Sequence, residues 1–396
     1  MKTSTIILAF VLPLTLWLTA CSDKDSGIDD GGGNQGKNIV VTSNINTNTT
    51  WTKNNVYELG GRITVLSGAT LTIEAGTIIK GQAGEGASAT ALLIARGGKL
   101  NAQGTATAPI IFTSVADEIT PADIAAGRFA SPNLSPTVNG LWGGILILGK
   151  ARISASTGES VQIEGIPTSD QNGLYGGTDD SDNSGIIKYV SIRHGGTNIG
   201  SGNEINGLTL GGVGSGTVIE NIEVVANQDD GIEWFGGSVS VKNAVVWNCN
   251  DDAIDTDQSW SGTLDNFVVI ASDGAGAHAF ELDGPEGAYS AGHTIQNGTV
   301  FASDGARKVE NLIDVDQNSI VALKNINFRN VLVGQKINRV TAPGVTFEGI
   351  LIDVPAGSTL ADHVNGIIPA GVTAGSTNKA NTAVLNWTWA AKAGKF

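Results

Sequence analysis

Apolar and polar positions alternate along this chain in short runs, and the runs repeat at a fixed spacing between residues 216 and 262. The phrase Asn221-Ile222-Glu223-Val224-Val225 returns 22 residues later as Asn243-Ala244-Val245-Val246-Trp247. The segments Asp229–Glu233 and Asp251–Asp255 match at the same offset, with an Asp pair, an Ile and an acidic residue. Self-similarity at a period of about 20 residues is typical of a solenoid.

Similar short runs occur on both sides of this repeat. Each is rich in β-branched or apolar residues and is bounded by Gly, Asn, Asp or Ser, which is the pattern of short strands separated by turns. These runs begin at Leu71, Ile187, Leu208, Asn266, Asn297, Asn325 and Asn330. Strands this short need neighbours above and below them, so they are expected to stack as coils.

The spacing predicts an all-β fold, a right-handed parallel β-helix that forms a solenoid of roughly 22-residue coils. Inward Ile, Val and Leu would stack in rows about 4.8 Å apart along the axis. The recurring Asn would occupy a coil corner, where its side-chain amide can bond the Asn above and below. A β-sandwich lacks such a self-match, and a propeller would need a period of about 40 residues.

Three segments interrupt the pattern. Residues 115–139 contain Thr120-Pro121, which predicts a loop with a short helix starting there. Residues 156–184 form a second long excursion. Asn381–Lys392 is expected to form a capping helix that covers the open end of the solenoid. We therefore expect a β-helix domain over residues 39–370 and a C-terminal cap segment over residues 371–396.

Composition agrees with this architecture and narrows the range of partners. The 396 residues include 54 Gly, and 41% are hydrophobic while 15% are charged. That much apolar surface excludes a chain disordered over most of its length, and the Gly content fits many tight turns. The formal net charge of −15 argues against a nucleic-acid partner, because phosphate binding needs concentrated Lys and Arg.

The N-terminus predicts export and lipid anchoring. Lys2 and the apolar run Ile6–Leu18 fit a signal peptide over residues 1–20, and the residues before Cys21 resemble the lipobox of bacterial lipoproteins. Cys21 would then be lipidated and would anchor the protein to a membrane surface. The alternative is a plain secretory signal without lipidation. Cys249 would be left without a disulfide partner, and we expect it to be a small buried hydrophobic residue.

Residues 21–38 are polar and Gly-rich, which predicts a flexible tether between the lipid and the fold. The acidic stretch Ser22–Asp25 resembles the export signal of surface lipoproteins in Bacteroidota, although Lys24 interrupts it. We therefore expect the protein on the outer membrane, lipid-anchored and exposed at the cell surface.

Several segments resemble the coils of β-helix lipoproteins that are common in Bacteroidota. These segments are Val56–Val65, Gly68–Lys80, Leu100–Ser114, Gly140–Gly149 and Tyr189–Gly196. Together the resemblance spans most of residues 40–335. It implies the parallel β-helix fold, and it carries no settled activity for that group of proteins.

The main candidate chemistry is acidic. With the 22-residue register, carboxylates of successive coils fall into one row: Asp229, Asp230 and Glu233, then Asp251, Asp252 and Asp255, extended by Asp273, Glu281 and Asp283. Carboxylates about 4.8 Å apart repel each other, and a bound cation offsets the repulsion. Ca²⁺ takes 6–8 oxygen ligands and is the expected cation, with Asp229, Asp251 and Asp255 among its ligands. A hydrated row of Asp at turns is the alternative.

A second candidate for Ca²⁺ is the segment Thr178–Gly185. Asp180 and Asp182 stand at alternate positions before a Gly, as at the start of an EF-hand loop. The position at which such a loop places its bidentate Glu is Ser191, so the match is partial. The alternative is a solvated acidic loop.

Three tryptophans lie close to the acidic row in the sequence. A flat indole face beside carboxylates is suited to sugar rings, so we expect a binding face that combines both residue types. Its members would be Glu233, Trp234, Trp247, Asp255, Trp260 and Glu281. The alternative is that these tryptophans pack inside or between the coils.

These patterns predict a cell-surface lipoprotein that acts as a binding or interaction module for a glycan, a divalent cation or an outer-membrane partner. The alternative is a β-helix polysaccharide lyase or glycoside hydrolase, with catalytic carboxylates among Asp229, Asp230, Asp251 and Asp252. His278 and His293 do not stand in the contexts that such enzymes use, which disfavours catalysis. A structural or adhesive surface component is a third interpretation.

Overall fold

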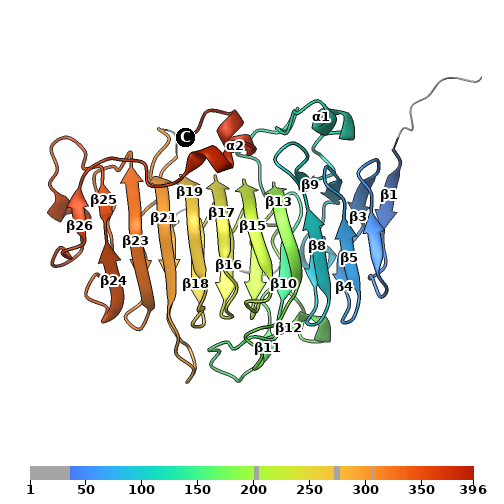
Figure 1. The fold of residues 1–396 in the computed structure, drawn as a ribbon, viewed down its shortest axis with the longest axis horizontal. Coiled ribbons are helices and arrows are strands. Elements are labelled where there is room, and N and C mark those ends of the chain that lie inside the picture. The colour runs from blue at the N-terminus through green and yellow to red at the C-terminus, as the bar shows by residue number, and fades with distance from the viewer. Residues whose placement is uncertain (1–35, 200–204, 272–276, 306) are drawn as a thin grey trace, which may run out of the picture. The chain divides into compact units, whose positions relative to one another are not determined.

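The computed structural model describes residues 36–199, 205–271, 277–305 and 307–396, and in it short parallel strands stack coil upon coil (Figure 1). One sheet has 16 strands and is called the long sheet; the other has eight and is called the short sheet. Pairing between neighbouring strands is parallel in both. This is the parallel β-helix that the repeat predicts.

The long sheet follows one path through successive coils. Its strands in spatial order are β1 (Asn38–Val41), β3 (Val56–Leu59), β6 (Ile78–Gly81), β9 (Ile110–Ser114), β13 (Gly185–Arg193), β15 (Val218–Val225), β17 (Val241–Trp247), β19 (Thr263–Ile270), β21 (His293–Phe301), β23 (Ile320–Arg329), β25 (Ile350–Ile352) and β26 (Val372–Ala374). Beside this path lie β2 (Thr49–Trp51), β5 (Thr70–Ile73), β8 (Lys99–Gln103) and β24 (Gly344–Glu348). Strand β26 lies just beyond the boundary expected at residue 370.

The short sheet carries the second side of each coil. It contains β4 (Arg62–Val65), β7 (Ala91–Ile94), β10 (Ile145–Leu148), β14 (Leu208–Gly211), β16 (Ile232–Phe235), β18 (Ile254–Asp257), β20 (Phe280–Leu282) and β22 (Asp314–Val315). An antiparallel pair, β11 (Val161–Gln162) and β12 (Leu174–Tyr175), lies in the excursion between β10 and β13. Short 3₁₀ turns span Gly86–Ser88, Gln171–Gly173, Leu360–His363 and Thr382–Leu385.

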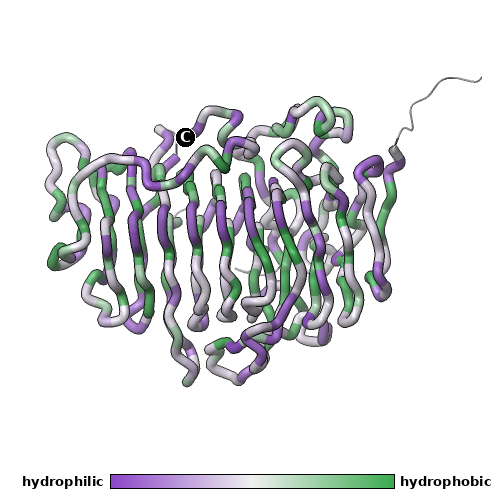
Figure 2. The backbone as a smooth tube through the Cα atoms, in the orientation of Figure 1, coloured by the Kyte–Doolittle hydropathy of each residue, from purple (hydrophilic) through white to green (hydrophobic). Residues whose placement is uncertain are grey.

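The core consists of apolar side chains stacked in register between the sheets. On the long sheet, Val224, Val246, Val269, Val300 and Phe328 pair in succession, and all are buried. Figure 2 shows hydrophobic and hydrophilic positions interleaved along these strands. In a neighbouring row, residue 298 must be a glycine, because a Cβ atom on Gly298 would lie 2.0 Å from Cζ of Phe267.

The recurring Asn forms the predicted ladder at a coil corner. Asn243 Nδ2 donates to Asn221 Oδ1 (3.1 Å), Asn266 Nδ2 donates to Asn243 Oδ1 (2.8 Å), and Asn325 Nδ2 donates to Asn297 Oδ1 (2.7 Å). All five have φ between 53° and 62°, a left-handed conformation that Asn tolerates better than most residues. The ladder bonds join residues 22, 23 and 28 apart, so later coils are larger than the predicted repeat.

The expected helix in the first interruption is present as α1, Pro121–Ala125. Thr120 caps it: Asp123 N donates to Thr120 Oγ1 (3.4 Å), and Thr120 N donates to Asp123 Oδ2 (3.0 Å). This reciprocal pair is a capping box, and Pro121 stands where a missing N–H costs nothing. Across the described ranges, no helix is long and apolar enough to cross a membrane.

The C-terminal segment does not cover the end of the solenoid as the sequence suggested. Residues 378–396, called the C-terminal strap, cross the outer face of the long sheet (red in Figure 1), and α2 is short, Trp389–Lys392. Leu385 and Trp389 pack against outward side chains of the middle coils: Val225, Val245, Trp247, Val268 and Ile270. These strand ends are apolar on both faces, so they need a cover outside the core.

Candidate functional site

Four carboxylates stand in register on the outer face of the short sheet. Glu233 pairs with Asp255, Asp255 with Glu281, and Glu281 with Asp314 across strands β16, β18, β20 and β22. Successive side chains along a strand point to opposite faces. Because Ile232 and Trp234 belong to the core, Glu233 points outward. The sequence register therefore places Glu233, Asp255 and Glu281 of the predicted row correctly, and the structure adds Asp314.

Four more carboxylates lie in the turns that lead into β16 and β18. Asp229 and Asp230 precede β16, and Asp251 and Asp252 precede β18 one coil later. Asp252 N donates to Asp230 Oδ1 at 2.9 Å, which ties the two turns together. We call the eight residues the acidic stripe: Asp229, Asp230, Glu233, Asp251, Asp252, Asp255, Glu281 and Asp314.

Parts of the acidic stripe are close enough to share an ion. Asp229, Asp230 and Asp251 each offer an oxygen within 4.8 Å of the others, and so do Asp230, Glu233 and Asp255. Ca²⁺–oxygen distances are about 2.3–2.6 Å, so oxygens on opposite sides of one ion lie roughly 4.8 Å apart. The two groups share Asp230, so their five carboxylates lie in one continuous cluster.

Burial and mutual repulsion make these carboxyls hard to ionise. Burial, followed by repulsion from neighbouring carboxylates, raises the pKa of Asp230 and of Asp255 well above the ordinary range, and burial does the same for Glu233. A hydrogen bond with Asp252, together with burial, raises the pKa of Glu281 to about 10. Burial raises the pKa of Asp257, on the same sheet, to about 8.

Hydrogen bonds and ion pairs from neighbouring side chains reach only some of the carboxylate oxygens in the acidic stripe. Asn206 Nδ2 donates to Glu233, and His278 and Arg339 form ion pairs with Asp252 and Asp314. Oδ1 of Asp255 is buried and has no hydrogen-bond partner among the described residues. A buried carboxylate oxygen without a donor, between two other carboxylates, is a position that a cation would satisfy.

Nearly all of the β-helix matches a known family model. The model describes a pectate-lyase-like β-helix domain, and it matches residues 43–127 and 129–388. The chain belongs to this family. No curated protein and no solved structure matches it. Membership accounts for the fold of the pectate-lyase-like domain, and the chemistry must still be argued from its own side chains.

The three tryptophans of the expected sugar-binding face are buried, so that expectation is wrong. Trp234 and Trp260 are 0% exposed and stack on each other inside the β-helix with ring centroids 4.5 Å apart. Trp247 is 1% exposed and lies beneath Trp389 of the C-terminal strap. Of the predicted binding face, Glu233, Asp255 and Glu281 lie together on the outer side of the short sheet.

In the predicted EF-hand-like segment, Asp180 and Asp182 both have partners within the protein. Asp180 pairs with Arg152, whose side chain and main-chain N both donate to it, and this lowers the pKa of Asp180. Asp182 is buried and accepts a hydrogen bond from Ser184 Oγ (3.3 Å). Neither residue joins a group of potential metal ligands in the part of the chain that the structure describes.

The remaining sequence predictions concern Cys249 and the N-terminal segment. Cys249 is a free, buried thiol, as expected, and burial raises its pKa. The described residues do not include Cys21, the signal peptide, nearly all of the tether or Asp273 of the predicted acidic row.

Asp314 and Asp257 were not among the predicted site residues. Asp314 follows a longer coil, in which the 22-residue spacing no longer indicates the register.

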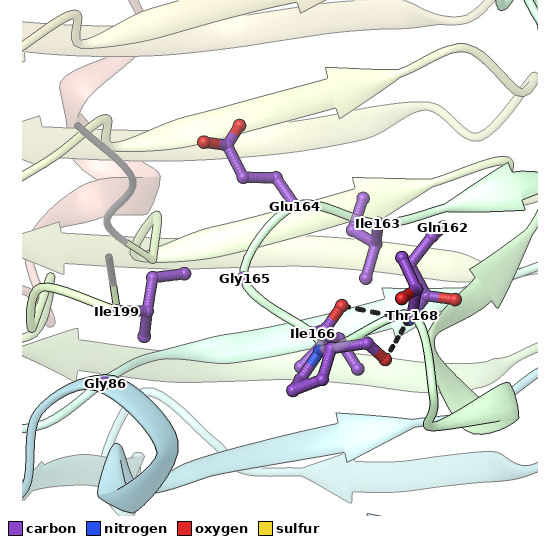
Figure 3. Close-up of a pocket in the computed structure, with 9 residues that line it drawn as sticks. Gly86, Gln162, Ile163, Glu164, Gly165, Ile166, Thr168 and Ile199 are labelled. Carbon is purple, nitrogen blue, oxygen red and sulfur yellow. Dashed lines mark hydrogen bonds between the residues drawn. The ribbon is translucent and has the colours of Figure 1, made fainter. Parts of the chain in front are cut away.

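A hollow of about 500 Å³ lies beside the short sheet, between the excursion and Ile199 (Figure 3). Ile163, Ile166 and Ile199 line it, and Gln162 Nε2 donates to carbonyl oxygens of the loop, including Ile166 O at 3.1 Å. Glu164 lies on its rim and points away from Ile166 in Figure 3. The amide of Gln162 is therefore engaged by the loop itself.

The raised pKa values predict an unusual pH dependence of stability for the protein without divalent cations. Folded Asp283, Asp257 and Glu281 titrate near 6, 8 and 10, whereas unfolded carboxyls titrate near 4. The folded state therefore keeps protons that the unfolded state has released. These three carboxyls therefore stabilise the folded state most below about pH 4, and their contribution to the free energy of unfolding falls as the pH rises toward 10. Each group loses up to about 1.4 kcal/mol per pH unit, and solvent screening reduces this figure.

Thermal melting in a chelator should therefore give a lower Tm at pH 8 than at pH 5. The double variant Asp257→Asn with Glu281→Gln should lose much of that slope, because neither replacement titrates. Asp353→Asn, which changes a carboxylate after β25 on the long sheet, is the matched control and should keep it. A Tm that rises between pH 5 and pH 8 in the unmodified protein would contradict the assigned pKa directions.

Proposed function

We propose that the protein is a lipid-anchored surface binding module that binds Ca²⁺ through Asp230, Glu233 and Asp255 of its acidic stripe. The observation that carries the proposal is the buried, unpartnered Oδ1 of Asp255, within reach of the carboxylates of Asp230 and Glu233. The anchor would be Cys21, and the cell surface of the outer membrane would be its location. The formal charge of −15 supports a cation as ligand and argues against nucleic acid.

The burial of Asp230 and Glu233, with Asp255 partly buried beside them, favours a bound ion over a hydrated acidic surface. Asp230 and Glu233 are 7% and 8% exposed, and Asp251 at the edge of the group is exposed. An ion held there has protein oxygens on its buried side and an open side facing solvent. Ca²⁺ accepts six to eight oxygens in flexible geometry, so hydroxyl or carboxylate oxygens of a glycan would complete its coordination. Sugar stacking is not part of this proposal, since Trp234, Trp247 and Trp260 are buried.

Calcium titration with thermal melting tests the proposal. At a Ca²⁺ concentration of about 100 times Kd, the folded state should gain about 2.7 kcal/mol, which raises Tm by several degrees. Asp255→Asn should lose this response, because an amide cannot supply the charge that attracts the ion. In a chelator at pH 8 the same variant should melt at a higher temperature than the unmodified protein, because Asn removes a carboxyl that burial makes costly to ionise.

Asp353→Asn again serves as the control and should respond to Ca²⁺ like the unmodified protein. A Tm that Ca²⁺ leaves unchanged, or that rises equally in Asp255→Asn, would rule out the acidic stripe as the calcium site. A glycan panel with and without Ca²⁺ then tests whether the ion recruits a saccharide.

Cleavage of a polysaccharide is the second candidate function, and membership of the pectate-lyase-like family favours it. The acidic stripe holds carboxyls of raised pKa, Asp230 and Glu281 among them, and a general acid in polysaccharide cleavage needs a raised pKa. The same glycan panel decides between the two: release of shortened or unsaturated sugars identifies an enzyme, and binding without product identifies a module.

A further inference from the structure

A third group of ligands in the structure differs in chemistry from the other two. Asp252 lies in the turn before β18, His278 lies just before β20, and Glu281 lies within β20. Their ligand atoms are all within 4.8 Å of one another. The side chains of Asp252 and His278 are 3% and 15% exposed, so the group sits at the boundary between the protein and solvent.

The backbone holds these side chains in place across two coils. His278 N donates to Asp252 Oδ1, and Ala253 N donates to His278 O at 3.2 Å. Asp252 and His278 are therefore fixed by main-chain bonds on both sides of their contact. Glu281 is hydrogen-bonded to Asp252 and pairs in register with Asp255. The arrangement is prearranged by the coil stacking and does not depend on long flexible side chains.

The imidazole of His278 lies against the carboxylate of the preceding coil. His278 Nδ1 is 3.1 Å from Asp252 Oδ1, without the full geometry of a hydrogen bond. Nδ1 is buried and lacks a hydrogen-bond partner within the described ranges. Two atoms that each lie about 2.1 Å from the same ion are roughly 3.0–3.4 Å apart. The distance of 3.1 Å between His278 Nδ1 and Asp252 Oδ1 falls within this range.

Nitrogen and oxygen together indicate the class of metal. Ca²⁺ and Mg²⁺ prefer oxygen ligands, whereas one imidazole with two carboxylates suits Zn²⁺ and related divalent transition metals. Three protein ligands leave a coordination position open for water or another ligand. We propose that Asp252, His278 and Glu281 bind Zn²⁺, in a site separate from the calcium ligands Asp230, Glu233 and Asp255.

Titration of the full chain with Co²⁺, and its displacement by Zn²⁺, tests this site. Co²⁺ bound by imidazole and carboxylates gives a visible absorption band, so the readout is independent of any activity. One equivalent of Co²⁺ should develop the band in the presence of excess Ca²⁺, and one equivalent of Zn²⁺ should remove it. His278→Gln should weaken Zn²⁺ binding by more than about tenfold, since even the loss of an outer-shell partner costs 10–100-fold.

Two further variants separate this site from the proposed calcium site. Asp255→Asn should lose the Ca²⁺ response and keep the Co²⁺ band, whereas Glu281→Gln should lose the band and keep its fold by circular dichroism. The other three histidines, His194, His293 and His363, are buried, so His278 is the imidazole that this assay reports. Absence of the band in the unmodified protein, or an unchanged Zn²⁺ affinity in both His278→Gln and Glu281→Gln, would overturn the proposal.

Discussion

Replacement of Glu223 by Ala is expected to lower the free energy of unfolding by about 3–5 kcal/mol, because it leaves a buried charge without its partner. Arg193 and Glu223 are 1% and 0% exposed, and Nη2 of Arg193 lies 3.6 Å from Oε2 of Glu223. Ser191 bridges them: its Oγ donates to Glu223 Oε2 (2.6 Å) and accepts from Arg193 Nε (2.8 Å). Denaturant unfolding monitored by circular dichroism measures the loss.

The C-terminal strap closes over this ion pair, which explains why its removal should be so costly. Ala390 N donates to Glu223 Oε1 at 3.0 Å, and the guanidinium carbon of Arg193 lies 4.9 Å from the ring centroid of Trp389. Glu223→Ala therefore breaks a contact of the strap as well as the ion pair. The double variant Arg193→Met with Glu223→Leu removes both charges and should be much less destabilised than Glu223→Ala. If Glu223→Ala and the double variant were equally destabilised, the loss of stability would not come from the unpaired charge of Arg193.

Replacement of Trp234 by Ala should also cost about 3–5 kcal/mol, the range for deleting a large aromatic side chain from a core. The indole is fully buried and stacks on Trp260 at an interplanar angle of 24°. Trp234→Phe keeps most of the packed volume and should cost clearly less. The measurement is the midpoint and slope of denaturant unfolding for the three proteins.

The same variant separates a core role from a sugar-binding role. If Trp234 contacted a glycan at the surface, its replacement by Ala would leave stability nearly unchanged and abolish glycan binding. A loss of stability below about 1 kcal/mol would therefore contradict the packing described here.

The register of the coils could be predicted from sequence because it depends on local repetition. Asn221, Asn243 and Asn266 recur at nearly equal spacing, and the ladder that they form fixes which residues stack. Glu233 and Asp255 follow from the same register. The larger coils after Asn266 contain insertions, so Asp314 could not be placed by counting residues.

The wrong assignment of the tryptophans has a simple physical reason that the sequence already contained. Glu233 and Trp234 are adjacent in one strand, and adjacent side chains point to opposite faces. An outward Glu233 therefore requires an inward Trp234. Trp247 is different, because it does face outward and is covered by the C-terminal strap. That contact joins residues more than 100 positions apart, and no local pattern indicates it.

A crystal structure of the protein grown with Ca²⁺ tests most directly whether the acidic stripe is a calcium site. We expect anomalous density for an ion coordinated by Asp230, Glu233 and Asp255, with Oδ1 of Asp255 among its ligands. Well-ordered carboxylates with no ion between them at saturating Ca²⁺ would contradict this assignment.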